Sequence, residues 1–99
     1  MKNFQISQTL PREIRLSGAG YKPANGIYTW NTISSRYEKD DEYQCFVDYL
    51  PMHGTWYVYG LKEDLDIYLS EIKDTPVGAY FKIRHEQTNL EPCPSVEKI

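Results

Sequence analysis

Apolar and polar residues alternate along most of the chain, and this period of two predicts β-strands rather than helices. Ile14 and Leu16, for example, each have polar neighbours on both sides. Strands are expected at residues 13–17, 27–31, 43–50, 55–59 and 79–84. The run at 55–59 is the clearest, because its aromatic and β-branched residues lie between two glycines.

Residues 61–72 fit two patterns. Every second residue from 65 to 69 is apolar, as in a strand, but the apolar residues of the segment also fit one face of a helix that begins with acidic residues. We favour the strand. Between the predicted strands, residues 51–54 predict a four-residue hairpin loop, and the acidic residues 38–42 predict a polar turn.

Glycines mark two sites in the segment before the second strand. Asn25-Gly26 is a tight-turn signal, since both residue types tolerate positive φ. Gly18-Ala19-Gly20 follows a strand as phosphate-binding loops do, but such a loop needs a third glycine and a helix, and here Pro23 follows instead. We therefore interpret Gly18-Ala19-Gly20 as a turn whose glycines permit left-handed or crowded backbone.

Six short runs separated by turn signals predict an all-β protein with one domain over residues 1–99. The expected architecture is a small antiparallel sheet of about five to six strands, either a curled meander or a minimal barrel. Its ordered core should extend from about residue 11 to residue 85. Residues 86–99 are polar and contain Pro92 and Pro94, so an extended or frayed tail is expected there.

The composition shows which side chains must fill the core of this sheet. Leu, Ile, Val and Phe are scarce, whereas the chain has nine Tyr and two Trp. Each of these rings can bury on the order of 150 to 250 Å² while its polar atom stays at the boundary with water. Aromatic residues should therefore supply much of the buried surface.

Charge and cysteine content narrow the classes of partner and compartment. The net charge is −3, and the basic residues are scattered, which argues against a nucleic-acid surface. The chain has neither an apolar leader nor an apolar run long enough to span a membrane. Cys45 and Cys93 do not form a disulfide framework and are expected to be free thiols. A cytoplasmic protein that binds neither nucleic acid nor membrane is the expectation.

No catalytic, metal or cofactor site is predicted. A nucleophile arrangement of Cys45, His53 and Asp48 can be drawn, but Cys45 and His53 flank a hairpin, and a strand cysteine is more often a small buried hydrophobe. The acidic residues between 38 and 42 lack the alternating ligands and glycine of a hand-type calcium loop. Neither His53 nor His85 has metal ligands at a suitable spacing.

The tyrosines are the remaining candidate for function. If Val58, Ile67 and Phe81 point inward, alternation places four tyrosines on the opposite face: Tyr57, Tyr59, Tyr68 and Tyr80. A second layer or a curled barrel could bury these rings, in which case they would only stabilise the sheet. If they are exposed, they form a binding surface, because exposed aromatic patches mark protein partners.

Two functions are compatible with these residues. The favoured one is a non-enzymatic module that binds a protein partner or a second copy of itself, through the tyrosine face or a free sheet edge. The alternative is a small-ligand or carbohydrate-binding domain, or a small hydrolase, with its site in the mouth of the curled sheet. The hydrolase would use residues among Cys45, His53, Asp64 and Asp66.

A further pattern covers the chain from Ser17 to Pro94. Its members are, in order, Ser17-Gly18-Ala19-Gly20, Asn25-Gly26-Ile27-Tyr28, Tyr37-Glu38-Lys39, Trp56-Tyr57-Val58, Tyr68, Thr75-Pro76-Val77-Gly78-Ala79-Tyr80 and Glu91-Pro92-Cys93-Pro94. The chain resembles in this a small β module of plant, algal and protist proteins, often repeated or fused to other domains and without a settled function. The resemblance implies a β fold and an interaction module, and it implies no catalytic residue.

Overall fold

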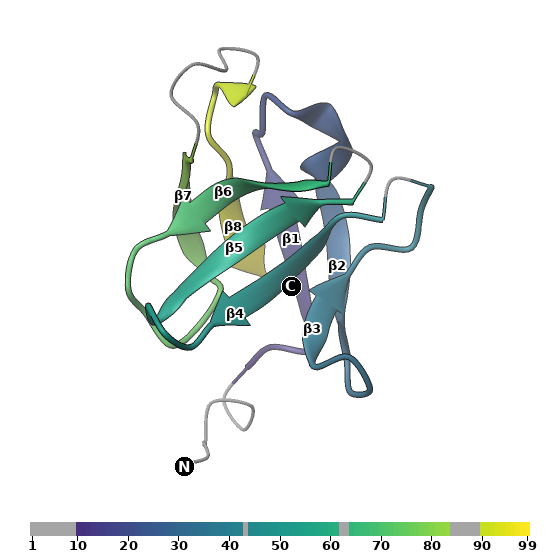
Figure 1. Ribbon diagram of the computed structural model, residues 1–99. Coiled ribbons are helices and arrows are strands. Elements are labelled where there is room, and N and C mark those ends of the chain that lie inside the picture. Colours follow the sequence, from purple (N-terminus) through teal and green to yellow (C-terminus); the bar gives the residue numbers. More distant parts are fainter. Residues whose placement is uncertain (1–9, 43, 62–63, 84–89) are drawn as a thin grey trace.

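The protein is a closed barrel of eight antiparallel strands that follow one another in chain order (Figure 1). The computed structural model describes residues 10–42, 44–61, 64–83 and 90–99. The elements are β1 (Glu13–Ser17), the 3₁₀ turn η2 (Lys22–Ala24), β2 (Gly26–Asn31), β3 (Arg36–Glu38), β4 (Phe46–Leu50), β5 (Thr55–Gly60), β6 (Leu65–Ser70), β7 (Gly78–Lys82) and β8 (Ser95–Lys98).

The all-β prediction is confirmed, and the minimal barrel is the form that the sheet takes, with eight strands in place of five to six. The hairpin loop at residues 51–54 joins β4 to β5 as expected. The two additional strands are β3 and β8. β3 has three residues and lies just before the acidic turn. Tyr43 and Arg84, expected in strands, lie outside the described residues.

β8 lies in the segment where the sequence suggested an extended or frayed tail. Its residues pair with β1 over four positions and with β7 over two, so this strand closes the barrel. Arg15 of β1 and Glu97 of β8 add an ion pair at 3.1 Å on the outer surface. Because the sheet closes on itself, the described strands offer no free sheet edge to a partner.

A β-bulge in β6 decides which of its side chains enter the core. Val58 lies opposite Tyr68 and Tyr59 lies opposite Asp66, so Ile67 is an extra residue with no partner on β5. An extra residue interrupts the alternation of a strand, and Ile67 and Tyr68 are in fact both fully buried. Segment 61–72 thus contains a strand, as favoured, but the prediction that Tyr68 points outward is wrong.

The orientation of β7 is also opposite to the prediction. Tyr80 lies opposite Ser70 and is 1% exposed, whereas Phe81 lies opposite Leu69 and is 56% exposed. Residues opposite each other in a sheet project to the same side. β7 pairs with the part of β6 that follows the bulge, and this pairing sets which of its side chains point inward. Tyr80 therefore points into the core, although hydrophobicity alone would place Phe81 there.

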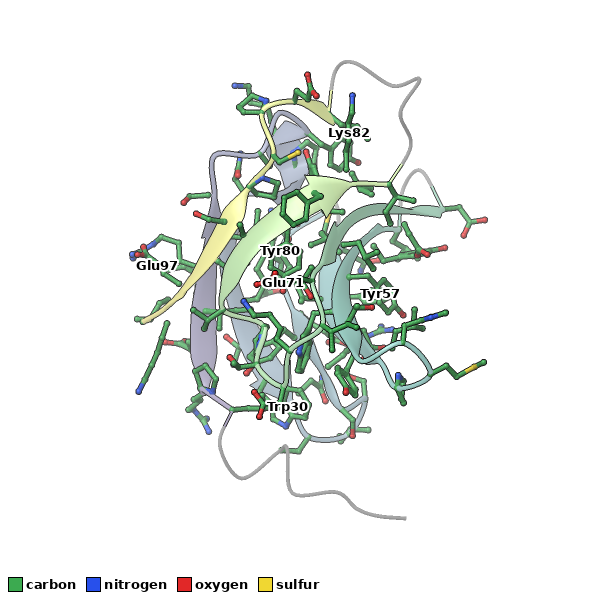
Figure 2. All side chains as sticks on the ribbon, turned by 90° about the vertical axis from the view of Figure 1, so that its left-hand side faces the viewer. Trp30, Tyr57, Glu71, Tyr80, Lys82 and Glu97 are labelled. Carbon is green, nitrogen blue, oxygen red and sulfur yellow. The ribbon has the colours of Figure 1, made fainter. Side chains whose placement is uncertain are left out.

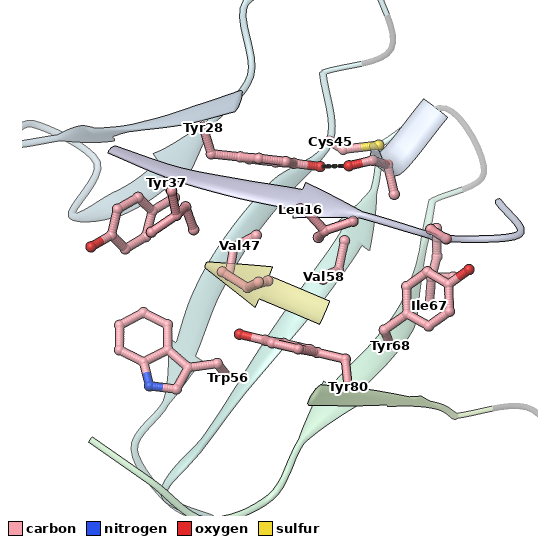
Figure 3. Close-up of a cluster of buried hydrophobic side chains, with 14 of the residues drawn as sticks. Leu16, Tyr28, Tyr37, Cys45, Val47, Trp56, Val58, Ile67, Tyr68 and Tyr80 are labelled. Carbon is pink, nitrogen blue, oxygen red and sulfur yellow. Dashed lines mark hydrogen bonds between the residues drawn. The ribbon is translucent and has the colours of Figure 1, made fainter. Parts of the chain in front are cut away.

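Aromatic rings fill much of the barrel interior around smaller aliphatic side chains (Figure 3). Four of the rings belong to tyrosines whose hydroxyl groups each donate a hydrogen bond to a backbone carbonyl of a segment outside the strands. The bonds run from Tyr28 to Ala24 (2.5 Å), from Tyr37 to Pro11 (2.5 Å), from Tyr68 to Leu90 (2.7 Å) and from Tyr80 to Pro76 (2.7 Å). A buried hydroxyl without a partner would cost stability, so each bond lets a tyrosine serve as a core residue.

The starts of β2 and β7 share one local arrangement. Gly26 and Gly78 have φ angles of 142° and 126°, which side chains rarely adopt, and each precedes a core tyrosine by two residues. A lysine side chain occupies the space beside each glycine and donates to the carbonyl of the residue before it: Lys39 to Asn25 (2.8 Å), and Lys73 to Val77. Each glycine thus makes room for a lysine that fixes the turn.

The glycine turn before η2 has the crowded and left-handed backbone that was expected. Gly18 has a φ of 81°, and a Cβ at Gly20 would collide with the carbonyl of Glu91. Asn25 has an ordinary φ of −71°, and its side chain bonds instead to the N–H and the C=O of Ala19 (2.9 and 3.2 Å). Only Gly26 of the Asn25-Gly26 pair therefore uses the positive φ that the sequence suggested for both.

The Tyr80 hydroxyl bond can be tested by Tyr80→Phe. The substitution keeps the ring but leaves the Pro76 carbonyl without its donor, so we expect the free energy of unfolding to fall by about 1 to 3 kcal/mol in urea denaturation. Tyr49→Phe is the matched control, because the Tyr49 hydroxyl has no hydrogen-bond partner within the described chain. Equal effects of the two substitutions would show that the Tyr80 bond does not stabilise the barrel.

Candidate functional site

Outward side chains of β3 to β7 form two rows that cross the barrel wall. The first row runs from β3 to β6 and consists of Glu38, Phe46, Tyr59 and Asp66. The second row lies next to it, runs from β4 to β7 and consists of Asp48, Tyr57, Leu69 and Phe81. We call the five apolar members the outer apolar face: Phe46, Tyr57, Tyr59, Leu69 and Phe81. It extends over β4 to β7, and acidic residues stand at three of the four row ends.

The rings at the centre of the outer apolar face pack on one another. Phe46 stacks on Tyr59, with centroids 4.9 Å apart and planes 17° apart, and meets Tyr57 edge-on at 6.3 Å. The guanidinium carbon of Arg36 lies 3.8 Å from the centroid of the Phe46 ring, a cation–π contact, while its Nε bonds Glu38 at 2.8 Å. These contacts cover Phe46 and leave Tyr57 and Tyr59 partly exposed.

The two outer tyrosines donate their hydroxyl hydrogens to carboxylates. Tyr57 bonds Asp48 at 3.5 Å, and Tyr59 bonds Asp64 in the turn before β6. Burial, together with the negative charge of Asp48, raises the pKa of Tyr57 to about 12. The bond to Asp64 raises the pKa of Tyr59. Both tyrosines therefore carry neutral hydroxyls at physiological pH, beside negative charge.

Asp48 and Glu38 have pKa values that are shifted in opposite directions. Asp48 is half-buried on β4, and this burial raises its pKa despite the hydrogen bonds that it accepts from the Tyr49 amide (2.7 Å) and the Tyr57 hydroxyl. Glu38 shows the opposite behaviour, since the hydrogen bond from Arg36 lowers its pKa. Arg36 thus pairs with Glu38, whereas burial disfavours the ionised form of Asp48.

The structure divides the four tyrosines that the sequence proposed as a binding surface. Tyr57, labelled in Figure 2, and Tyr59 lie on the outer wall, whereas Tyr68 and Tyr80 lie in the core (Figure 3) with their hydroxyls bonded. Sequence reasoning missed the other three members of the surface, Phe46, Leu69 and Phe81. Only the cross-strand register, including the bulge in β6, reveals that Phe81 faces the same side as Tyr57.

The residues of the alternative hydrolase are not brought together. Cys45 is buried before β4, with its thiol 3.6 Å from the carbonyl of Pro23, whereas His53 is exposed in the turn that follows β4. The two residues therefore lie at opposite ends of one strand. Asp64 and Asp66 lie near the outer apolar face instead. Both cysteines are free, as expected, and Cys93 is exposed.

A groove of about 550 Å³ opens on the outside of β2 and β3. It is lined by Ile27, Thr29, Trp30, Asn31, Thr32, Glu38, Lys39 and Asp40. Asn31 and Arg36 bond the Glu38 carboxylate, and Lys39 bonds backbone carbonyls and Asp41. Glu38 and Lys39, two charged residues of the groove lining, are thus already bonded to other groups of the protein. This weakens the case for the groove as a ligand site.

In the part of the chain that the structure describes, no three side chains of His, Cys, Asp or Glu come close enough to hold a metal ion. None of its helices has the length and apolar character needed to cross a membrane. Comparison with known proteins adds nothing to these observations, since no family model, curated protein or solved structure matches the chain.

The raised pKa of Asp48 can be tested by the substitution Asp48→Asn. Because its pKa is raised in the folded state, the ionised carboxylate costs stability above the raised pKa, and this cost disappears as the pH falls below the ordinary pKa of an aspartate. Asparagine keeps an acceptor for Tyr49 and Tyr57. We expect the variant to melt at a higher temperature than the wild type at pH 7 and at the same temperature at pH 3.

Asp66→Asn is the control for this experiment, since it removes the same charge from an exposed position on the neighbouring part of the wall. Its melting temperature should stay close to that of the wild type at pH 7. A lower melting temperature for Asp48→Asn at pH 7 would show that the Asp48 charge is already compensated in the free protein.

Proposed function

We propose that this protein is a non-enzymatic interaction module whose outer apolar face binds a protein partner. The observation that carries the proposal is the exposure of Phe81, 56% accessible at the end of a row of apolar side chains that crosses β5 to β7. Scattered apolar side chains are normal on protein surfaces, whereas a contiguous patch with an acidic border is typical of an interface. The partner is another protein or a second copy of this chain.

Two further observations support a surface-mediated role. The barrel interior is filled by side chains, so the space that a barrel can offer to a small ligand is taken by the aromatic core. The described strands have no unpaired edge, which leaves the wall rather than an edge as the place for a partner. Two free thiols fit a reducing compartment, and we expect the protein to act in the cytoplasm.

The proposal is tested by Phe81→Ser, which removes the most exposed ring of the outer apolar face. Ile27→Ser is the matched control, since Ile27 is 48% exposed on the outer side of β2, away from this face. We expect both variants to fold like the wild type, because surface substitutions usually change stability by about 0.5 kcal/mol or less. Phe81→Ser alone should weaken association, by about tenfold or more.

The measurement has two parts. Light scattering across a range of concentrations gives the solution mass of the three proteins and detects self-association. Quantitative mass spectrometry of proteins that copurify from cells of the source organism detects other partners. A dimer or a copurifying protein lost with Phe81→Ser and kept with Ile27→Ser supports the proposal. The same mass and the same copurifying proteins for all three chains would refute it.

A further inference from the structure

Apart from Arg36, which lies over Phe46, the described charged side chains around the outer apolar face are negative. Asp48 and Asp66 stand on opposite sides of the Tyr57–Tyr59 pair, and Asp64 receives the Tyr59 hydroxyl from the turn before β6. Among the outward-facing described residues of β4 to β7, no side chain is basic. Arg36, on the adjoining β3, is the nearby cation, and it forms an ion pair with Glu38.

Of the two carboxylates beside the tyrosine pair, Asp48 accepts hydrogen bonds from uncharged donors, and Asp66 has no hydrogen-bond donor within the described chain. Asp48 accepts from the Tyr49 amide and the Tyr57 hydroxyl, and within the described chain neither Asp48 nor Asp66 takes part in an ion pair. Arg36 is close enough to act on Asp48 electrostatically, but its ion pair is with Glu38. A half-buried carboxylate without an ion-pair partner of its own is an unfavourable arrangement for an isolated protein. A positively charged partner would relieve it.

The rings of this surface are suited to the same kind of partner. A cation is attracted to the face of an aromatic ring, and guanidinium groups also stack on it. The protein already makes one such contact, where the Arg36 guanidinium lies over Phe46, which itself stacks on Tyr59. Tyr59 continues this stack toward β6, with Tyr57 edge-on to Phe46 beside it, and on the β6 side the nearby charged groups are carboxylates.

We propose that the outer apolar face binds a segment of a protein partner that carries Lys or Arg, with a cationic side chain on the Tyr57 and Tyr59 rings between Asp48 and Asp66. The inference rests on the function proposed above and adds the chemistry of the partner. The apolar residues Leu69 and Phe81 contact the uncharged part of the same segment. The acidic border makes the face unsuitable for anionic partners and favours fast association with basic ones.

The experiment is a titration of ¹⁵N-labelled protein with hexa-arginine, followed by amide chemical shifts, with hexa-glutamate as the peptide of opposite charge. We expect saturable shifts on β4, β5 and β6 with hexa-arginine and none with hexa-glutamate. In the double variant Asp48→Asn with Asp66→Asn, the dissociation constant should rise by about tenfold or more, because the cation loses both carboxylates.

The control is the double variant Asp40→Asn with Glu42→Gln, which removes the same number of charges from exposed positions in the segment between β3 and β4. Its dissociation constant should stay within about twofold of the wild type, which separates a local site from attraction to the net charge of the protein. An equal loss of affinity in both double variants, shifts centred on residues 40–42, or no saturable binding would overturn the inference.

The outcome can be told apart from that of the proposed function. If hexa-arginine does not bind but Phe81→Ser still removes a partner, the face is an interface for an uncharged segment, and only the present inference fails. If hexa-arginine binds at β4 to β6 while Phe81→Ser changes neither the solution mass nor the copurifying proteins, the cation site stands and the proposed function fails.

Discussion

Four buried tyrosine hydroxyls tie the interior of the barrel to the segments that connect its strands. Each hydroxyl donates to a backbone carbonyl outside the sheet, at Pro11, Ala24, Pro76 or Leu90. The rings supply the buried surface that the few aliphatic residues cannot, and the hydroxyls satisfy carbonyls that would otherwise be left without donors. Core packing and the conformation of the connecting segments therefore depend on the same side chains.

This use of tyrosine divides the aromatic residues of the described chain into an inner and an outer set, and on β6 and β7 the bulge at Ile67 makes the division. Before the bulge, β6 follows the alternation of β5, with Asp66 beside Tyr59 on the outer wall. After it, Tyr68 turns into the core, and β7 follows with Tyr80 inside and Phe81 outside. The composition of the outer apolar face is thus a consequence of how the core is built.

The strands with strict alternation could be predicted from the sequence. Residues 13–17 alternate strictly between apolar and polar, and the aromatic and β-branched run at 55–59 lies between two glycines, so the positions of both strands follow from the sequence. β3 could not be found, because three residues are too few to show a period. β8 could not be found either, since its four residues include one apolar side chain and follow two prolines.

The candidate site was predictable only as far as β5. Tyr57 and Tyr59 follow from the alternation of one clear strand. Tyr68 does not follow from alternation, because the extra residue in β6 places both Ile67 and Tyr68 in the core. This extra residue leaves no local signal in the sequence and appears only when Val58 is matched with Tyr68 across the ladder. Phe81, the most exposed ring of the surface, is assigned to the core by hydrophobicity alone, and only its register with Leu69 shows that it faces outward.

The division into inner and outer tyrosines is also what gives the surface its proposed chemistry. Core rings with bonded hydroxyls contribute packing, while Tyr57 and Tyr59 bring ring faces and carboxylate neighbours to the wall, where a basic segment can reach them. Both the fold and the proposed binding surface therefore depend on where the tyrosines lie. Burial raises the pKa of Tyr28, Tyr37, Tyr68 and Tyr80.

The decisive measurement is a pH titration followed by NMR of protein labelled with ¹³C at the tyrosine Cζ atoms, with each signal assigned by a Tyr→Phe variant. We predict that Tyr28, Tyr37, Tyr68 and Tyr80 stay protonated for as long as the chain stays folded, beyond the pH at which a solvent-exposed tyrosine ionises. If Tyr68 or Tyr80 ionised near the ordinary pKa of a tyrosine while the fold remained intact, the division into inner and outer tyrosines would be contradicted.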